Sequence, residues 1–173
     1  MVRVGIIGLR HGHILSIVRD AQSLEDAEVV AVAEEEESIL QPVRELGLPI
    51  YADHKEMLDR EELDAVAVAT VNSEKGAVIA ECLTGGLHVI ADKPLVTSME
   101  DLDAVRNAWE RSAKKLLVML TLRYNAPFLA LRRFVDEGGL GEPVAFFATG
   151  PHKLSLPSRK PWMLRDDQCG GII

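Results

Sequence analysis

Two short segments of the sequence carry residue types that bind phosphates or transfer protons. The first, residues 5–13, reads GIIGLRHGH and combines glycines with one guanidinium and two imidazoles. The second, residues 88–95, reads HVIADKPL and places Asp92, Lys93 and Pro94 in succession. A glycine-rich turn lets backbone amides approach a pyrophosphate, and a lysine at the end of a strand can donate to a substrate oxygen or shuttle its proton. These two segments therefore define the candidate site.

The glycine turn departs from the usual G-x-G-x-x-G pattern, because Arg10 stands where the second glycine is expected. Its position directly after an N-terminal apolar run still favours a dinucleotide site over a merely tight strand–helix turn. Arg10 has two interpretations, a cation on the phosphates or a surface residue on a reshaped loop. His11 and His13 are poor evidence for a metal site, because they stand two residues apart with no carboxylate near them in the sequence, and we expect no metal there.

Glu34 is the predicted partner of the nucleotide's ribose. It ends the second apolar run, about twenty residues beyond Gly12, where a carboxylate accepts hydrogen bonds from ribose hydroxyls and repels a 2′-phosphate. Residues 35–37 are further glutamates, and their negative charge adds to that of Glu34. The sequence therefore favours NAD over NADP. The same acidic residues also suit a solvated helix start.

Short runs rich in Val, Ile and Leu alternate with amphipathic stretches through about the first 120 residues. The runs have the continuous hydrophobicity of strands covered on both faces: residues 2–7, 29–33, 65–70, 87–91 and 116–120, with 50–51 as a weaker candidate. The stretches between them have helical spacing, with caps predicted at Asp53, Ser73 and Ser98. This alternation predicts an α/β fold with a doubly wound, parallel sheet of Rossmann type.

Beyond Tyr124 the pattern changes. We expect a helix over about residues 127–137, a strand over 142–149, and then a long irregular segment that contains three prolines. The sequence therefore predicts a dinucleotide-binding domain over residues 1–123 and the beginning of a second, incomplete domain over 124–173.

Composition limits the classes of partner. The chain has 27 acidic and 19 basic side chains and a net charge of −8, which argues against a dedicated nucleic-acid or anionic-membrane surface. Its longest apolar runs are about a third of a bilayer span, and no cleavable signal is visible. Cys82 and Cys169 lack CxxC spacing, so the sequence suggests neither a disulfide scaffold nor a zinc knuckle. We therefore expect a cytoplasmic protein with no nucleic-acid or membrane partner.

Six motifs, in order along the chain, make the sequence similar to the glucose–fructose oxidoreductase/inositol dehydrogenase (Gfo/Idh/MocA) family of NAD(P)-dependent oxidoreductases. Asp-Lys-Pro stands where that family has Glu-Lys-Pro, and TVNSEK stands where it has Thr-Pro-Asn-x-x-His. The six matching segments are Val4–His13, Thr70–Lys75, Asp92–Pro94, Arg123–Pro127, Gly138–Glu142, and Trp162 with Arg165 before Gly170 and Gly171.

The resemblance implies hydride transfer between nicotinamide and a secondary alcohol of a small molecule, a sugar, cyclitol or related polyol. It implies that Lys93 is catalytic, and that NAD, with NADP disfavoured, is held by Gly8, Leu9, Arg10, His11, Gly12, Glu34, Thr70, Val71, Asn72, Asp92, Lys93 and Pro94. Residues 124–173 would begin the α+β domain that binds substrate and forms a homo-oligomer in the full-length protein.

The sequence also departs from the family pattern. Val71 and Lys75 replace the family's Pro and His, and the family's second catalytic histidine would lie beyond the last residue of the chain. We therefore expect weak or no turnover from these 173 residues alone. These departures leave a second function open, a non-catalytic dinucleotide-binding sensor or interaction protein.

Overall fold

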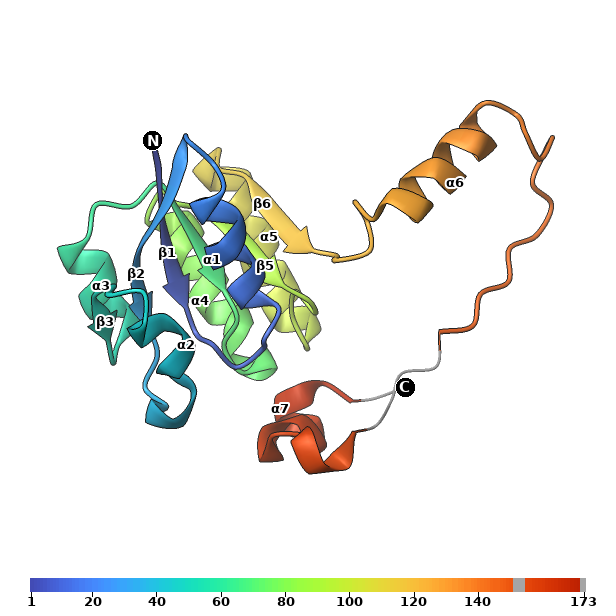
Figure 1. Cartoon of the computed structure of the whole chain (residues 1–173). Coiled ribbons are helices and arrows are strands. Elements are labelled where there is room, and N and C mark those ends of the chain that lie inside the picture. The colour runs from blue at the N-terminus through green and yellow to red at the C-terminus, as the bar shows by residue number, and fades with distance from the viewer. Residues whose placement is uncertain (151–154, 172–173) are drawn as a thin grey trace. The chain divides into compact units, whose positions relative to one another are not determined.

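The computed structural model describes residues 1–150 and 155–171. The described chain divides into two compact units, one formed by residues 1–119 with 161–171 and the other lying within Leu120–Lys160. In the first unit a sheet carries helices on both faces (Figure 1). The division into domains 1–123 and 124–173 stays a prediction. Residues 161–171, which belong to the predicted second domain, pack with the first compact unit.

The sheet is parallel, with strand order β3-β2-β1-β4-β5-β6. Its strands are β1 (Val2–Ile7), β2 (Ala27–Ala33), β3 (Ile50–Tyr51), β4 (Ala65–Val68), β5 (His88–Asp92) and β6 (Leu116–Met119). The strand order reverses between β1 and β4, and ligands of open parallel sheets bind beyond the carboxyl ends of the strands at such a point. The predicted Rossmann-type sheet is confirmed.

Alternate residues of the strands form two separate apolar cores, one on each face of the sheet. On one face Ile6 and Ala67 pack with helices α1 (Ile14–Gln22) and α2 (Gln41–Arg44). On the other face, Val66 and Val68 pack with α3, α4 and α5, which span His54–Arg60, Asn72–Thr84 and Met99–Ser112. Burial on both faces explains why the strands read as continuous apolar runs.

Two of the three predicted helix caps are present. Asp53 Oδ1 accepts a hydrogen bond from the Lys55 amide at the start of α3, and Ser98 Oγ accepts one from the Asp101 amide at the start of α5, each at 3.0 Å. The predicted cap at Ser73 was wrong. Helix α4 begins one residue earlier, at Asn72, and no side chain caps it, because the N-cap residue is Val71, which has no side-chain acceptor.

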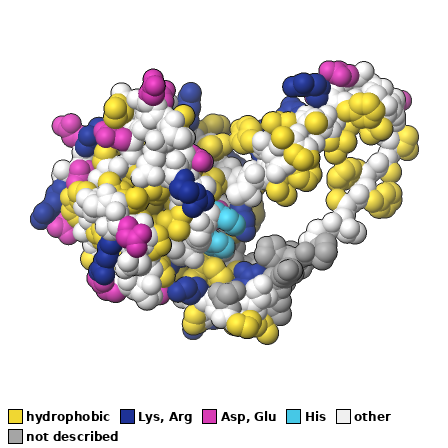
Figure 2. Space-filling view, in the orientation of Figure 1, with side chains coloured by type: hydrophobic (Ala, Val, Ile, Leu, Met, Phe, Trp, Pro, Cys, Tyr) yellow, Lys and Arg dark blue, Asp and Glu magenta, His cyan; other side chains and the backbone are white. Residues whose placement is uncertain are grey.

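The second unit contains helix α6 (Ala126–Asp136), close to the helix predicted over residues 127–137. Apolar side chains are exposed along α6, and hydrophobic side chains gather over this unit (Figure 2). The strand predicted over 142–149 is not formed, and Val144 and Phe147 are 96% and 94% exposed. A strand needs a neighbour for its backbone hydrogen bonds, and no described residue supplies one here.

The segment predicted to be irregular has short helical turns where the structure describes it. These turns are η2 (Leu156–Ser158), η3 (Pro161–Leu164) and α7 (Asp166–Cys169), while Pro151 and the three residues after it lie outside the described part. Among the described residues, no helix has both the length and the apolar character needed to cross a membrane.

Close packing of α4 against α5 predicts a steric requirement at Gly76. A Cβ atom built on Gly76 would lie 2.6 Å from Asp101 Cβ. We expect Gly76→Ala to lower the free energy of unfolding by about 1–3 kcal/mol, because overpacking forces backbone shifts. Urea denaturation measures this change. Gly85→Ala, where the nearest atom would be 3.4 Å away, is the matched control and should change stability little. Equal stability of the two variants would contradict the tight α4–α5 contact.

Candidate nucleotide-binding site

The glycine turn after β1 is held between the ends of two neighbouring strands. The Gly8 amide donates to Ala33 O at the end of β2 (2.8 Å), and the Arg10 amide donates to Ala69 O just after β4 (3.0 Å). Gly8 has φ +81°, and a Cβ there would lie 2.7 Å from the Thr70 nitrogen. The turn therefore excludes a side chain at Gly8. A Cβ at Gly12 would meet no atom within 4 Å, so the turn is open to approach there.

Glu34 is buried at the end of β2 and is fixed by the same turn. Its Oε2 accepts a hydrogen bond from the Leu9 amide at 2.8 Å, and its Oε1 accepts one from the Glu36 amide at 2.8 Å. The Leu9 side chain is part of the core, so this residue contributes its backbone to the site. A carboxylate offers about four lone-pair positions, which leaves Glu34 able to accept a further hydrogen bond.

Arg10 is surrounded by carboxylates. Its Nη2 lies 2.9 Å from Glu34 Oε1 and 3.1 Å from Glu35 Oε1, and its Nη1 donates to Glu36. The side chain is mostly buried, so Arg10 is not a free surface residue in this structure. Because three carboxylates surround one guanidinium, this corner of the site keeps a net negative charge.

A cavity of about 550 Å³ opens beside this corner, at the carboxyl ends of β1, β2 and β4. Four of the predicted residues line it: Gly8, Arg10, Glu34 and Thr70. The sequence analysis missed other lining residues from the β3–α3 connection, the start of α3 and α4, among them Asp53, His54, Lys55, Glu74 and Glu81. Their signal in the sequence was weak, because β3 has only two residues and the residues after it read as an ordinary helix cap.

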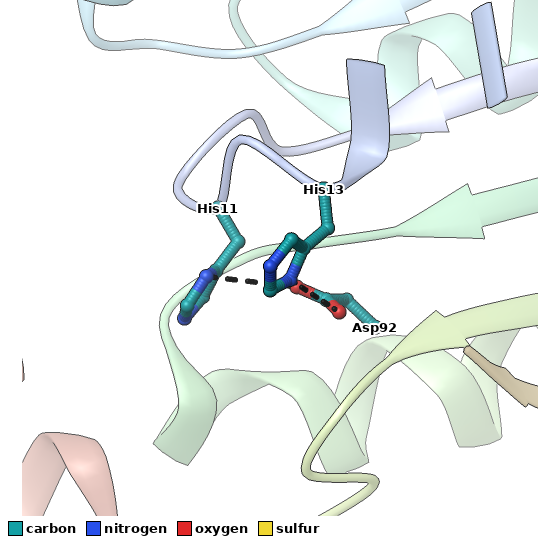
Figure 3. A group of neighbouring side chains, drawn as sticks. All are labelled: His11, His13 and Asp92. Carbon is teal, nitrogen blue, oxygen red and sulfur yellow. Dashed lines mark ion pairs between the residues drawn. The ribbon is translucent and has the colours of Figure 1, made fainter. Parts of the chain in front are cut away.

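A second cluster forms where β5 ends. The Asp92 side chain is fully buried, and its Oδ1 accepts a hydrogen bond from the Lys93 amide at 2.9 Å. His13 Nδ1 lies 3.5 Å from Asp92 Oδ1, and His11 Nδ1 lies 3.8 Å from Asp92 Oδ2. Both imidazoles come from the β1–α1 connection and approach this carboxylate from the same side (Figure 3). Histidine side chains also gather at one spot on the surface of the first unit (Figure 2).

This cluster corrects one argument from the sequence. The two histidines have no carboxylate near them along the chain, but the parallel sheet brings β5 to within two strands of β1. Asp92 therefore lies beside both rings. Burial lowers the pKa of His11 to about 4, although the nearby Asp92 carboxylate acts in the opposite direction. His11 is thus a neutral imidazole at physiological pH.

Lys75 is fully buried beneath the Asp-Lys-Pro turn. Its Nζ donates to Asn72 Oδ1 at 3.1 Å and to the backbone oxygens of Asp92 and Pro94 at 3.0 and 3.1 Å. Burial lowers the pKa of Lys75 to about 8. This one ammonium group ties the start of α4 to the turn that carries Lys93, which is itself half-buried and joined to Pro94 by a cis peptide bond.

Asn72 and His11 contact the 161–171 segment. The Asn72 Nδ2 donates to Cys169 O at 3.0 Å. Trp162 is buried, and its ring meets His11 edge-on with the ring centroids 5.7 Å apart. Val71 is a buried residue at the start of α4 and accepts a hydrogen bond from Thr70 Oγ1 through its backbone oxygen at 3.3 Å.

Most of the residues predicted to bind the nucleotide therefore fall into two groups along one edge of the sheet. Gly8, Arg10, Glu34 and Thr70 line the cavity, whereas His11, Asn72, Asp92, Lys93 and Pro94 surround the end of β5. The sequence analysis had rejected His13 as a ligand, had noted Lys75 only as a departure from the family, and had used Trp162 only as a motif residue.

A comparison with protein-family models identifies the chain. The model of the Gfo/Idh/MocA oxidoreductase family, NAD-binding Rossmann fold, matches residues 2–120. The chain belongs to this family. A search of curated proteins gave no match.

Solved structures share the fold of this family member. A protein from Erwinia carotovora atroseptica is 25% identical with a TM-score of 0.91, and the match covers 99% of this chain and 52% of that one. An NAD-binding protein from Listeria innocua is 27% identical, with a TM-score of 0.72 and coverages of 82% and 42%. The WlbA dehydrogenase from Chromobacterium violaceum, in complex with NADH and UDP-GlcNAcA, is 25% identical, with a TM-score of 0.73 and coverages of 81% and 41%. The chain spans about half the length of these structures or less.

The contacts of Lys75 predict a large effect of its removal on stability. We expect Lys75→Met to lower the free energy of unfolding by about 2–4 kcal/mol, because three oxygens, two of them in buried hydrogen bonds, lose their donor. Chemical denaturation measures the loss. The matched control is Lys115→Met, which removes an exposed ammonium and should change stability by less than about 0.5 kcal/mol. A Lys75→Met protein as stable as the parent would show that the turn does not depend on this group.

Proposed function

We propose that the first unit binds NAD along the carboxyl edge of its sheet. The observation that carries this proposal is the 550 Å³ cavity beside the Gly8 turn, with the buried Glu34 at its side. The backbone from Gly8 to Gly12 would face the pyrophosphate, and Glu34 the adenosine ribose. Thr70, Val71, Asn72 and the Asp92–Pro94 turn would lie on the nicotinamide side. The excluded side chain at Gly8 and the open approach at Gly12 fit this assignment.

The charges around Arg10 favour NAD over NADP. Arg10 is the guanidinium at the ribose corner, and Glu34, Glu35 and Glu36 already surround it. A 2′-phosphate placed there would meet a net negative charge and would have to displace these carboxylates from Arg10. A 2′-hydroxyl only needs an acceptor, which Glu34 supplies.

We further propose that the full-length protein is an NAD-dependent dehydrogenase acting on a hydroxyl of a sugar, cyclitol or related polyol. A bound nicotinamide would supply the hydride acceptor. Lys93 would hold or move the proton of the reacting hydroxyl, since its backbone is fixed on both sides, by Asp92 Oδ1 and by Lys75 through Pro94 O. The nucleotide-sugar ligand of the similar WlbA dehydrogenase supports a sugar-like substrate. Substrate binding and homo-oligomer contacts are proposed for the second domain.

Titration of the protein with NADH and with NADPH tests the cofactor assignment. We expect NADH to bind more tightly, and Glu34→Gln to weaken NADH binding by about 10-fold or more, because a hydrogen bond to a charged acceptor contributes about 1.5–3 kcal/mol. The gap between NADH and NADPH should narrow in this variant. Energy transfer from tryptophan to the reduced nicotinamide, or calorimetry, measures both affinities.

Glu37→Gln is the matched control, because it removes the same charge from an exposed side chain outside the cavity lining. It should leave NADH affinity within about twofold of the parent. Failure of both nucleotides to bind would reject the nucleotide site. Equal affinities for both would reject the role of the glutamates.

Lys93→Met in the full-length protein tests the proton-transfer role. We expect kcat for polyol oxidation to fall by about 100-fold or more, the usual contribution of a general acid–base group, while NADH affinity stays within a few-fold of the parent. Steady-state rates from NADH absorbance and a parallel binding titration provide both numbers. Unchanged turnover would exclude Lys93 from catalysis, and NADH binding with no turnover on any polyol would favour a dinucleotide sensor.

A further inference from the structure

We propose that His11, His13 and Asp92 form a binding site for one divalent transition-metal ion of the Zn²⁺ and Co²⁺ type. One nitrogen from each imidazole and one oxygen of the carboxylate all lie within 4.8 Å of one another. The site is separate from the cavity assigned to the adenosine end of the nucleotide, and none of its three residues lines that cavity. The proposal stands on the chain's own donor atoms and does not depend on NAD.

Two of the donor atoms are buried without a hydrogen-bond partner. They are Asp92 Oδ2 and His13 Nδ1. The Asp92 side chain is fully buried, and its carboxylate faces the two rings from the β1–α1 connection, with Oδ2 on the side of His11 (Figure 3). A buried polar atom left unpaired costs about 1–3 kcal/mol, so folded proteins rarely keep one without a ligand or water. A metal ion between the rings and the carboxylate would satisfy both atoms.

The spacing of the donor atoms suits coordination after a small adjustment. His11 Nδ1 lies 3.8 Å from Asp92 Oδ2, and His13 Nδ1 lies 3.5 Å from the other carboxylate oxygen, Oδ1. Ligand atoms about 2.0–2.2 Å from a tetrahedral ion lie about 3.3–3.6 Å from one another. The two rings are stacked nearly parallel, 16° apart with centroids at 5.4 Å, so both present an edge to the same carboxylate.

The donor set also indicates which ions would bind. Imidazoles suit zinc, cobalt, nickel and iron, whereas magnesium and calcium prefer an all-oxygen set. The nearby ammonium groups of Lys75 and Lys93 repel a cation, so an ion bound only by electrostatic attraction is disfavoured at this position. Lys75 Nζ is directed at Asn72 and two backbone oxygens and not at the carboxylate, so Asp92 keeps Oδ2 for a metal. The Lys93 amide orients the carboxylate through Oδ1, as an outer-shell partner does.

With three protein ligands, such an ion keeps at least one coordination position open, as in catalytic zinc sites. The open position would take water or an oxygen of a small molecule that enters beside Lys93. The site therefore adds a metal-binding function to the end of the sheet where proton transfer is proposed. It uses the side chains of two histidines, whereas the nucleotide assignment uses only the backbone of His11.

Titration of metal-free protein with Co²⁺, and with Zn²⁺ in competition, tests the site. The Trp109→Phe background leaves Trp162 as the single tryptophan, 5.7 Å from His11, so its fluorescence reports Co²⁺ at this position. We expect one equivalent of Co²⁺ to quench Trp162 and to give a visible absorption band. We expect Zn²⁺ to reverse both signals, and Mg²⁺ in excess to leave them unchanged.

His13→Gln is the decisive variant, because its side chain is 41% exposed and its replacement should not disturb folding. It should weaken Co²⁺ binding more than about tenfold, since even outer-shell changes cost 10–100-fold. Asp92→Asn should do the same, with circular dichroism as the folding check. The matched control is His54→Gln, an imidazole that also lies beside two carboxylates, Asp53 and Glu81, and it should bind Co²⁺ as the parent does.

Either of two results would overturn the proposal. One is the absence of Co²⁺ or Zn²⁺ binding up to millimolar concentration in a folded parent protein. The other is binding that His13→Gln and Asp92→Asn leave unchanged, which would place the ion elsewhere. Both are independent of the NADH titration, so a failed metal site and a failed nucleotide site are distinguishable.

Discussion

The buried ammonium of Lys75 is the interaction on which the candidate site depends most. A charge this deep in a protein is stable only when every donor has an acceptor, and here Asn72, Asp92 and Pro94 supply them. The same hydrogen bonds join α4 to the turn after β5. Because that turn carries Lys93 and orients Asp92, the geometry of the candidate site at the end of β5 follows from one desolvated lysine.

The topology of the sheet accounts for the rest of the arrangement. Strands β1, β2, β4 and β5 are parallel neighbours, so their carboxyl ends meet at one edge. Gly8, Glu34, Thr70 and Asp92 each follow or end one of these strands and are brought together from positions far apart in the chain. The β1–α1 connection lies at the centre of this edge. It therefore contributes to both groups of residues, with Arg10 toward the cavity and His11 toward Asp92.

Arg10 and its glutamates show how a departure from the usual glycine pattern is accommodated. A large cation replaces the second glycine of the turn, and the fold compensates with three carboxylates around it. The backbone path of the turn survives, because Gly8 keeps its positive φ and its contact with β2. The family assignment is thus compatible with an altered fingerprint, since the turn is still hydrogen-bonded to the neighbouring strands and to the buried Glu34.

The sequence by itself determined the sheet, most helix positions and the family, because buried parallel strands and turn residues leave local patterns. The strand predicted over 142–149 was wrong, because a strand forms only beside a partner, and local sequence does not show whether one is present. The start of α4 was also missed, because the side chain of Asn72 is used in tertiary contacts. Only the tertiary structure decided that Asp92 faces His11 and His13 and that Lys75 is buried beneath it. Those contacts join residues from separate strands and helices, and no local pattern records which side chains meet when parallel strands end side by side.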